Sequence, residues 1–444
     1  MAVVDASAFA DGDRADGTPL ERGVEAMKRQ IDARVASYFS SCVHCGLCAE
    51  ACMFYTETGD PRYTPIHKLE PMRKVWRREH TFWGRLAARL GLSAPLTEQD
   101  LADWEDLVYD SCTLCGRCSM VCPVGNDIAW MIRREREAMS AAGFAPKGLQ
   151  EATQRAVKTG SPMGVTFATL SAQLRRIERE TGLAIPVDRE GAEYLCLFSS
   201  LEIMGFPETL ESVARIFEHA GVSWTVSSRA FEATNSGIQI GDSAVAAELV
   251  ERIVDAALAL GVKTVISPEC GHAYTAIRWE GANLIGRPLP FEVIHIVELL
   301  DRLRAEGRLE TVGRTDARLT FHDPCNLARK GGVVDEPRRL LGAVASEFVE
   351  MADHGTMNWC CGGGGGVSAN ERATALRLRA FERKRDQIAE IDVGTVVTAC
   401  ANCRNMLEDG IEHCGMDVEV VGLSELIAER LAPGGGANRE ETVR

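Results

Sequence analysis

The feature that most constrains this chain is a repeated arrangement of cysteines near its N-terminus. The chain has 444 residues and 16 cysteines, and eight of these fall into two runs with the same spacing, C-x2-C-x2-C-x3-C. Three cysteines this close in sequence wrap one face of an iron-sulfur cluster in a tight loop. The runs are Cys42, Cys45, Cys48 and Cys52, and then Cys112, Cys115, Cys118 and Cys122.

This spacing is that of bacterial ferredoxins, in which the fourth cysteine of each run ligates the cluster of the other run. It therefore predicts two cubane [4Fe-4S] clusters. The alternative is a zinc site, but zinc usually takes two C-x2-C pairs, and two identical fourfold runs fit clusters better. We assign Cys42, Cys45, Cys48 and Cys122 to one cluster, and Cys112, Cys115, Cys118 and Cys52 to the other.

Composition indicates the class of protein that carries these runs. Apolar residues make up 45% and charged residues 25% of the chain, as in ordinary globular proteins. The net charge of −15 argues against a nucleic-acid partner. Residues 1–20 lack the apolar run of a signal peptide, and no later stretch has the roughly eighteen apolar residues that a spanning helix needs. We therefore expect a cytoplasmic protein whose thiolates bind metal in a reducing compartment.

Changes in composition divide the chain into segments, and its length suggests about three domains. The stretch between the two cysteine runs predicts helices, so the module is expected to be an α-helical ferredoxin domain. Arg73, Lys74, Arg77 and Arg78 form a basic strip on this insert, for which a solvated helix face is the favoured interpretation over a docking site. The predicted segments are a flexible arm (1–30), the ferredoxin domain (31–145), a helical connector (146–190), two α/β lobes (191–310 and 311–432) and a disordered tail (433–444).

The two lobes are predicted from a weak internal repeat in which short β-rich runs alternate with amphipathic helical stretches. In each half the last strand leads into a cysteine-bearing turn, SPEC at 267–270 and TACANC at 398–403. Such alternation suggests two small α/β lobes related by a pseudo-twofold. Strands are expected at 194–200, 222–226 and 262–267 in the first half, and at 318–321, 348–351 and 394–398 in the second.

Five further cysteines form a second constellation in the last lobe, and each falls at or near a predicted strand end. Adjacent cysteines cannot both grip one metal ion comfortably, but they can ligate two different irons of a cluster. A glycine run, Gly362–Gly366, follows the adjacent pair and lets the backbone pass close to something bulky. The five are Cys325, Cys360, Cys361, Cys400 and Cys403.

The segments HDPC (322–325), CCG (360–362) and C-x2-C (400–403) resemble the cysteine-rich CCG domain of heterodisulfide reductase. Joined to the ferredoxin runs in one chain, they resemble the D-type subunit of that enzyme and its relatives, which include catalytic Fe-S subunits of membrane complexes in dissimilatory sulfur metabolism. Iron-sulfur subunits of glycolate and glycerol-3-phosphate dehydrogenases are more distant relatives. The resemblance implies a noncubane [4Fe-4S] cluster that cleaves disulfides, held here by Cys325, Cys360, Cys361, Cys400 and Cys403.

The first lobe departs from this pattern. Asn235 and Ser236 stand where the paired cysteines would fall, Ser267 and Cys270 where the C-x2-C would fall, and Ser199 and Ser200 near the remaining position. One thiolate cannot hold a cluster, so a single C-terminal cluster is expected.

Cys270 is then a candidate nucleophile or resolving thiol, because His272 follows two residues later. A relic cysteine packed in a turn is the alternative. The candidate catalytic residues are thus Cys270, His272 and Cys361. His322 precedes Cys325 and is either a hydrogen-bond donor to the cluster or a structural residue.

The resemblance implies an oxidoreductase that passes electrons through the two cubane clusters to the noncubane one for disulfide chemistry. The expected partners are redox subunits, either a membrane cytochrome b-type subunit or a flavoprotein, with a small thiol or a sulfur-carrier protein as substrate. Membrane contact would then be peripheral, at the inner face, through the partner. The rival interpretation is an electron-transfer subunit of a flavin dehydrogenase of the glycolate or glycerol-3-phosphate type, in which Cys270 has no role.

Overall fold

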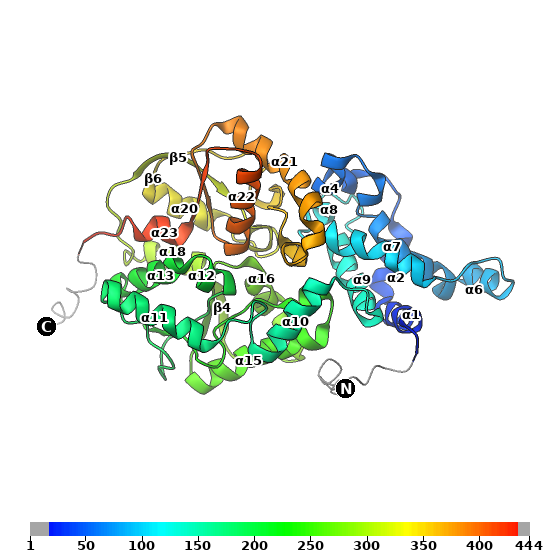
Figure 1. Ribbon diagram of the computed structural model, residues 1–444, viewed down its shortest axis with the longest axis horizontal. Coiled ribbons are helices and arrows are strands. Elements are labelled where there is room, and N and C mark those ends of the chain that lie inside the picture. The colour runs from blue at the N-terminus through cyan, green and yellow to red at the C-terminus, as the bar shows by residue number, and fades with distance from the viewer. Residues whose placement is uncertain (1–16, 434–444) are drawn as a thin grey trace. The chain divides into compact units, whose positions relative to one another are not determined.

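The computed structural model describes residues 17–433 (Figure 1). They fall into two compact units, each built from three segments of the chain. Unit 1 comprises Met1–Gln154, Ser236–Ala246 and Trp359–Lys384, and unit 2 comprises Arg155–Asn235, Ala247–Asn358 and Arg385–Arg444. Within residues 17–433, no helix combines the length and the apolar composition that are needed to cross a bilayer.

Unit 1 is helical, as expected of the ferredoxin region. Its hydrophobic core gathers Met27, Val35, Leu69, Met72 and Met139 from five helical elements. Its elements are α1 (Pro19–Gln30), α2 (Ala33–Ser41), α3 (Leu47–Glu50), α4 (Met53–Thr58), η2 (Pro61–Tyr63), η3 (His67–Leu69), α5 (Glu70–Val75), η4 (Trp76–His80), α6 (Phe82–Arg89), α7 (Glu98–Glu105), η5 (Asp106–Asp110), α8 (Arg117–Met120), α9 (Ile128–Ala142), α14 (Ser236–Ile240), η8 (Gly364–Ala369) and η9 (Glu371–Ala373).

Residues 1–30 are predicted to be a flexible arm, and this prediction is wrong for the second half of that segment. Pro19–Gln30 form helix α1, which packs along α9. The helix begins with a capping box: the Thr18 hydroxyl accepts from the Glu21 N–H at 3.2 Å, and the Glu21 carboxylate accepts from the Thr18 N–H at 2.7 Å. The helix has an apolar stripe on which Met27 is fully buried. The prediction missed this stripe because the segment as a whole is polar in composition. Residues 1–16 lie outside the described part.

Unit 2 contains two small α/β lobes, which confirms that part of the predicted fold class. Each has a four-stranded parallel sheet, with strand orders β2-β1-β3-β4 and β6-β5-β7-β8. The strands are β1 (Tyr194–Cys196), β2 (Trp224–Thr225), β3 (Thr264–Ser267), β4 (Glu292–His295), β5 (Thr315–His322), β6 (Ala345–Phe348), β7 (Thr395–Thr398) and β8 (Glu419–Gly422). The two sheets have the same order, and the pseudo-twofold between the lobes stays a prediction.

The central strands β3 and β7 are buried along their whole length, because helices cover both faces of a parallel sheet. Sequence patterns predict three strands in each lobe. They place the strand β6 three residues too late, at 348–351, and they miss β4 and β8, each of which begins with an exposed glutamate. The helices of this unit are α11 (Phe167–Thr181), α12 (Ser200–Met204), α13 (Pro207–His219), α16 (Gly271–Tyr274), η6 (Thr275–Trp279), α17 (Gly281–Ile285), α18 (Ile296–Ala305), α19 (Cys325–Ala328), α20 (Asp335–Val344), η7 (Gly355–Met357), α22 (Ala401–His413) and α23 (Leu423–Ala428).

Three helices contribute residues to both units, namely α10 (Lys147–Thr159), α15 (Ser243–Leu260) and α21 (Thr374–Ile391). Helices α10 and α11 fall within the predicted helical connector, 146–190. Of the predicted disordered tail, 433–444, all but Pro433 lies outside the described residues.

Candidate iron-sulfur sites

The two cysteine runs of unit 1 fold into loops with the same backbone geometry. The residue before the second cysteine, His44 in one run and Leu114 in the other, has a φ of 54°. The residue after that cysteine is a glycine in the left-handed region, with a φ of 85° at Gly46 and 81° at Gly116, and a short helix starts directly behind it. Left-handed backbone at a non-glycine residue is uncommon. Its recurrence at equivalent positions indicates that both loops wrap the same kind of object.

The first pocket collects three cysteines of the first run and the last cysteine of the second. Its walls carry Cys42, Cys45, Cys48 and Cys122, together with apolar side chains that include Ile66 and Leu69. Burial, reinforced by the neighbouring thiols of this group, raises the pKa of the Cys48 thiol to about 11. A thiol with such a pKa is protonated at neutral pH, so binding of metal here has to displace protons.

The second pocket holds the other four cysteines of the runs and one more. Cys52, Cys112, Cys115 and Cys118 line it, and so do Trp359 and Cys360 from the segment that carries the adjacent cysteine pair. Burial, reinforced by the neighbouring thiols, raises the pKa of Cys118 well above its ordinary value. Four thiols around each of two partly apolar pockets form the donor set that a [4Fe-4S] cluster requires.

A buried lysine adds a positive charge to this second group. The Lys68 side chain is 1% exposed, and its ammonium donates to the Cys52 sulfur at 3.9 Å and to the Ser111 carbonyl oxygen. Burial raises the pKa of the Cys52 thiol, and the charge of Lys68 opposes that shift. Lys68 is not predicted from the sequence, because a lone lysine 16 positions after Cys52 belongs to no motif.

The glycine run after the adjacent cysteines approaches the second cysteine loop closely. A Cβ at Gly365, whose φ is +61°, would lie 2.8 Å from the Thr113 carbonyl carbon and 3.1 Å from the Cys112 carbonyl oxygen. The predicted close passage of the backbone is therefore found, and the bulky neighbour is the loop that carries Cys112.

Arginine and aspartate side chains fasten these two segments of unit 1 together. The guanidinium of Arg136, fully buried, donates to the carbonyl oxygens of Cys112 at 2.7 Å and of Gly365 at 2.5 Å. Asp110, two residues before Cys112, accepts from Asn370 at 2.5 Å and from Arg372 at 2.7 Å. Charged hydrogen bonds from Arg136 and to Asp110 thus fix the segment that follows the adjacent cysteines against the second cysteine loop.

In unit 2 the remaining cysteines lie where strands end and helices begin. Cys325 is the first residue of α19 behind β5, Cys400 is the N-cap of α22 behind β7, and Cys403 is in the first turn of α22. All three are buried. The carboxyl ends of parallel strands form one edge of a sheet, so this edge gathers the cysteines that the sequence predicts there.

Cys270 has the same local setting as Cys400 rather than that of Cys403. It is the N-cap of α16, with φ −147° and ψ 99°, against φ −156° and ψ 112° for Cys400. When the two halves are aligned by their cysteines, Ser267 and Cys270 take the positions of Cys400 and Cys403. The structure shifts this alignment by three residues. When the two halves are aligned by the first residues of α16 and α22, Cys270 corresponds to Cys400 and Ala273 corresponds to Cys403.

The Cys270 turn is fastened to the turns of the other lobe. The Ala401 N–H donates to the Glu269 carbonyl oxygen at 2.7 Å. A Cβ at Gly271 would come within 3.0 Å of the Leu327 nitrogen, so α16 approaches α19 closely only because this residue is glycine. Burial, together with the charge of Cys400, raises the pKa of the Cys270 thiol above its ordinary value. Without a metal or another activating group, this thiol is not a thiolate at neutral pH.

Two buried carboxyl groups that the sequence patterns do not reveal lie beside Cys270. Glu202 accepts from the Ser199 hydroxyl at 2.6 Å and from the Glu269 N–H at 3.1 Å, and Glu269 accepts from the Ser424 hydroxyl at 2.6 Å. Burial raises the pKa of Glu202 to about 7 and that of Glu269 to about 8. The capping pattern SSLE at 199–202 is the available signal, and it predicts a helix start rather than a buried acid.

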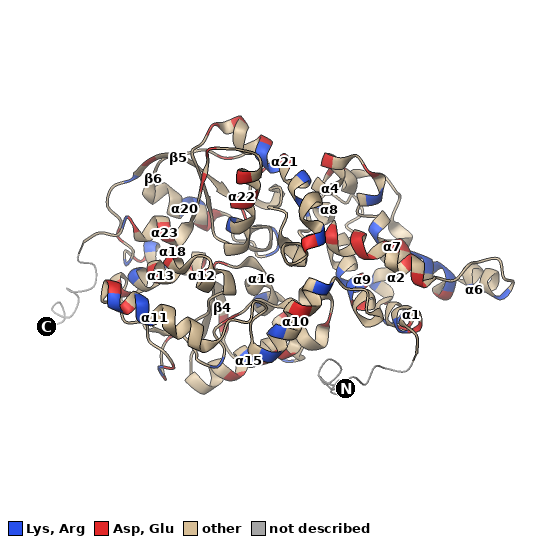
Figure 2. Cartoon of the chain, viewed as in Figure 1, with Lys and Arg blue, Asp and Glu red and all other residues tan. Residues whose placement is uncertain are grey.

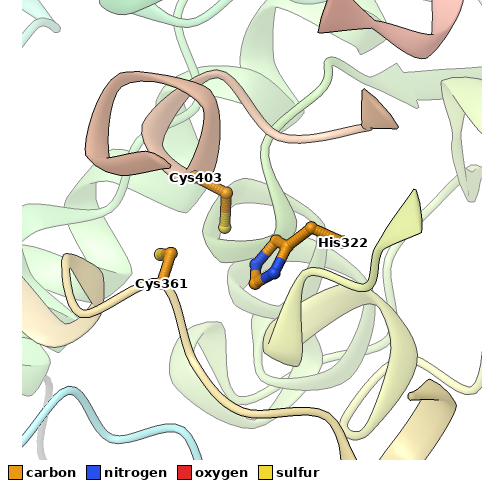
Figure 3. Close-up of side chains that lie close together, drawn as sticks. All are labelled: His322, Cys361 and Cys403. Atoms are coloured by element: carbon orange, nitrogen blue, oxygen red, sulfur yellow. The ribbon is translucent and has the colours of Figure 1, made fainter. Parts of the chain in front are cut away.

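Figure 3 shows His322, Cys361 and Cys403, whose side chains are all buried. His322 is the last residue of β5. From the sequence it is expected to be a hydrogen-bond donor to the cluster or a structural residue. In unit 2, a nitrogen of its ring lies within 4.8 Å of the Cys403 sulfur, which is one of the predicted cluster ligands. The His272 side chain is half-buried in α16, and its catalytic role stays a prediction.

Comparison with known proteins agrees with these two sets of cysteines. Residues 38–126 match a 4Fe-4S dicluster domain, and residues 319–408 match the cysteine-rich CCG domain. The chain is a homologue of the D-type subunit of heterodisulfide reductase. It is 28% identical to that subunit of the dihydromethanophenazine:CoB–CoM heterodisulfide reductase of Methanosarcina acetivorans, over 88% of this chain and 93% of that protein. The predicted resemblance is therefore confirmed.

Two other homologues come from different complexes. The Hdr-like menaquinol oxidoreductase iron-sulfur subunit of Archaeoglobus profundus is 27% identical over 89% of this chain and 79% of its own length. The EtfAB:quinone oxidoreductase of Syntrophomonas wolfei is 27% identical over 84% of this chain and 55% of its own length. The chain is thus an iron-sulfur oxidoreductase subunit with a dicluster domain and a CCG domain.

Proposed function

We propose that the chain relays electrons through two cubane [4Fe-4S] clusters to a C-terminal noncubane [4Fe-4S] cluster, at which thiol/disulfide chemistry takes place. The observation that carries this proposal is in unit 1, where Cys360 lines the same pocket as Cys52, Cys112, Cys115 and Cys118. A ligand of the C-terminal cluster and the ligands of a cubane cluster would then be neighbours. The ligands of the C-terminal cluster would be Cys325, Cys360, Cys361, Cys400 and Cys403.

The residues around the two pockets suggest the order of the relay. The first pocket, with Cys42, Cys45, Cys48 and Cys122, is bordered by exposed apolar side chains, of which Val43 is 67% and Val124 43% exposed. Exposed apolar side chains in a group mark surfaces that meet a partner. We infer that a redox partner subunit exchanges electrons at this pocket, and that the second pocket is the one that communicates with Cys360.

The clusters, when bound, would supply one-electron carriers and an iron site for the sulfur atoms of the substrate. Reduction of a disulfide to two thiols consumes two electrons and two protons. The chain's own groups near Cys270 that can hold a proton at neutral pH include the buried carboxyls Glu202 and Glu269. Their hydrogen bond, from the Glu269 N–H to the Glu202 carboxylate, keeps both beside the Cys270 turn. We propose that they retain protons for the thiols that form.

The experiment is an assay of the anaerobically reconstituted chain with reduced viologen and a panel of disulfides, including thiol-linked carrier proteins. Disulfide-dependent oxidation of viologen is expected, and it should be lost in Cys361→Ala. Cys414→Ala is the matched control, because Cys414 lies at the C-cap of α22 and belongs to no motif. Loss of turnover in Cys270→Ala with full iron content would assign this thiol to the reaction. Full turnover in Cys361→Ala would refute the proposed site.

A second candidate function is favoured by the EtfAB:quinone oxidoreductase homologue. In that case the chain passes electrons between a flavin dehydrogenase and another carrier, and no disulfide is cleaved. The same assay separates the two functions. If the chain oxidises viologen with a quinone acceptor and with none of the disulfides, and if Cys270→Ala is as active as the wild type, the second function is the correct one.

A further inference from the structure

Helix α6 of unit 1 carries a group of large apolar side chains that nothing in the described chain covers. The helix spans Phe82–Arg89, and none of its residues is buried. Trp83 is 75% and Phe82 67% exposed, and Leu90 and Leu92, directly behind the helix, are 64% and 78% exposed. Single exposed apolar residues are ordinary on protein surfaces, but a contiguous group indicates a binding surface.

The spacing of these residues places them on one side of the helix. At about 100° per residue, Phe82, Leu86 and Leu90 follow one another along one face, and Trp83 borders it. Phe82 and Trp83 pack edge to face, with ring centroids 5.1 Å apart. The group of Phe82, Trp83, Leu86, Leu90 and Leu92 is called the α6 apolar face below.

The opposite side of the helix rests on the rest of unit 1. A Cβ at Gly84 would lie only 1.7 Å from the carbonyl oxygen of Arg77, so glycine is required for the close approach of α6 to η4. The Thr81 hydroxyl donates to the same carbonyl oxygen at 2.6 Å and accepts from the Gly84 N–H at 3.0 Å. These contacts fix the helix so that its apolar face points away from the body of the unit, from which α6 projects in Figure 1.

Basic side chains surround the α6 apolar face. Residues 76–92 contain four arginines and one glutamate, whereas the whole chain has a net charge of −15. Arg85 and Arg89 lie one turn apart on α6 and are exposed, as is Arg77. Figure 2 shows Lys and Arg positions in blue on the segment of the chain that carries the label α6. Of the predicted basic strip, Arg73 is not solvated as expected: it is 2% exposed and pairs with Glu70 at 3.1 Å.

We propose that α6 binds the surface of an anionic lipid bilayer, with Phe82, Trp83 and the three leucines in the interface and the arginines among the headgroups. A Trp/Phe/Leu face combined with arginines is the composition of helices that lie in the plane of a membrane. Each arginine near a negatively charged leaflet adds attraction. A projecting helix that packs on η4 can enter a fluid surface, whereas a protein partner would have to supply a matching groove. This inference does not depend on the proposed redox function.

The test is flotation of the full-length reconstituted chain with vesicles of phosphatidylcholine, with and without phosphatidylglycerol. We expect the wild type to float with the anionic vesicles and the Trp83→Ser/Leu86→Ser variant to bind about tenfold or more weakly, because two apolar side chains no longer leave water. Leu258→Ser/Trp279→Ser is the matched control, since these unit 2 residues are 56% and 52% exposed. The Arg85→Glu/Arg89→Glu variant should lose the preference for anionic over neutral vesicles.

A second measurement places the contact at one residue. Lipids brominated in their acyl chains should quench part of the tryptophan fluorescence of the wild type on anionic vesicles, and this part should be absent in Trp83→Phe at equal binding. Iron content, measured for every variant, shows that the fold is intact. The proposal is overturned if the wild type does not float, or if the α6 and control variants bind equally. The proposal is also overturned if the amide hydrogens of α6 are protected from exchange with solvent when a partner protein is added but not when anionic vesicles are added.

Discussion

Removal of the buried charge at Lys68 should lower the reduction potential of one cubane cluster. The Lys68 ammonium lies 3.9 Å from the Cys52 sulfur, and two unit charges at this distance interact by about 4 kcal/mol at an effective dielectric constant of about 20. The electron added on reduction is spread over the whole cluster, so that Lys68 interacts with only part of it. About a quarter to a half of that energy corresponds to about 50–90 mV for a one-electron couple.

The assay is a redox titration of the reconstituted chain followed by electron paramagnetic resonance. Lys68→Met removes the charge at similar volume, and the potential of the cluster assigned to Cys52, Cys112, Cys115 and Cys118 should fall. In Lys68→Arg, which keeps the positive charge, the potential should stay close to that of the wild type. Lys74→Met is the control, since the Lys74 ammonium pairs with Asp100 at 2.9 Å and its side chain is 47% exposed. An unchanged or higher potential in Lys68→Met, with iron content and melting temperature retained, would refute the electrostatic argument.

Three further predictions concern stability and metal content. Gly365→Ala should destabilise the chain by about 1–3 kcal/mol in urea unfolding, because its Cβ meets backbone at 2.8 Å, whereas Gly394→Ala, with open space around it, should not. Burial raises the pKa of Glu269 to about 8, so the free energy of unfolding should fall as the pH rises from about 4.5 to 8 and the buried carboxyl loses its proton. This fall should be smaller in Glu269→Gln than in the control Glu292→Gln. Cys45→Ser should remove about four irons per chain and leave the signal of the second cubane cluster.

Local patterns in the sequence were enough to predict the ferredoxin loops. The spacing of the two runs predicts two groups of four thiols, and the structure places the thiols in those groups around separate pockets. The parallel lobes were predicted from strand–helix alternation, which depends on neighbouring residues only. The Cys270 register failed because β3 is followed by three residues up to the helix cap and β7 by two, and a comparison by cysteine position cannot detect that difference.

Contacts between segments far apart in the chain could not be predicted in this way. Cys360 lines the same pocket as Cys112, although 248 positions separate them, and neither spacing nor composition links the two. The same holds for the exposure of α6: its amphipathic pattern is visible in the sequence, but only the packing of Gly84 on Arg77 shows which side is left open. Burial of Glu202 and Glu269 likewise follows from tertiary structure, because Glu202 lies in the first turn of α12 and Glu269 in the loop after β3, and neither position shows a sequence pattern of burial.

The grouping of segments in unit 1 gives a physical reason for the glycine run in the CCG region. The cysteine pair leaves the lobe in which the other predicted ligands lie and is fastened to the ferredoxin loop, through Arg136 to Cys112 and through Asp110 to Arg372. The equivalent segment of the first half, Ser236–Ala246, also belongs to unit 1, and α14 packs there against η8. Each half therefore contributes one segment to unit 1, Ser236–Ala246 from the first half and Trp359–Lys384 from the second, and only the second of these segments contains cysteines. The packing of α14 on η8 thus keeps the first-half segment in unit 1 although it contains no cysteine, whereas in the second half the bonds to Arg136 and Asp110 hold the segment of Cys360 beside the second cysteine loop.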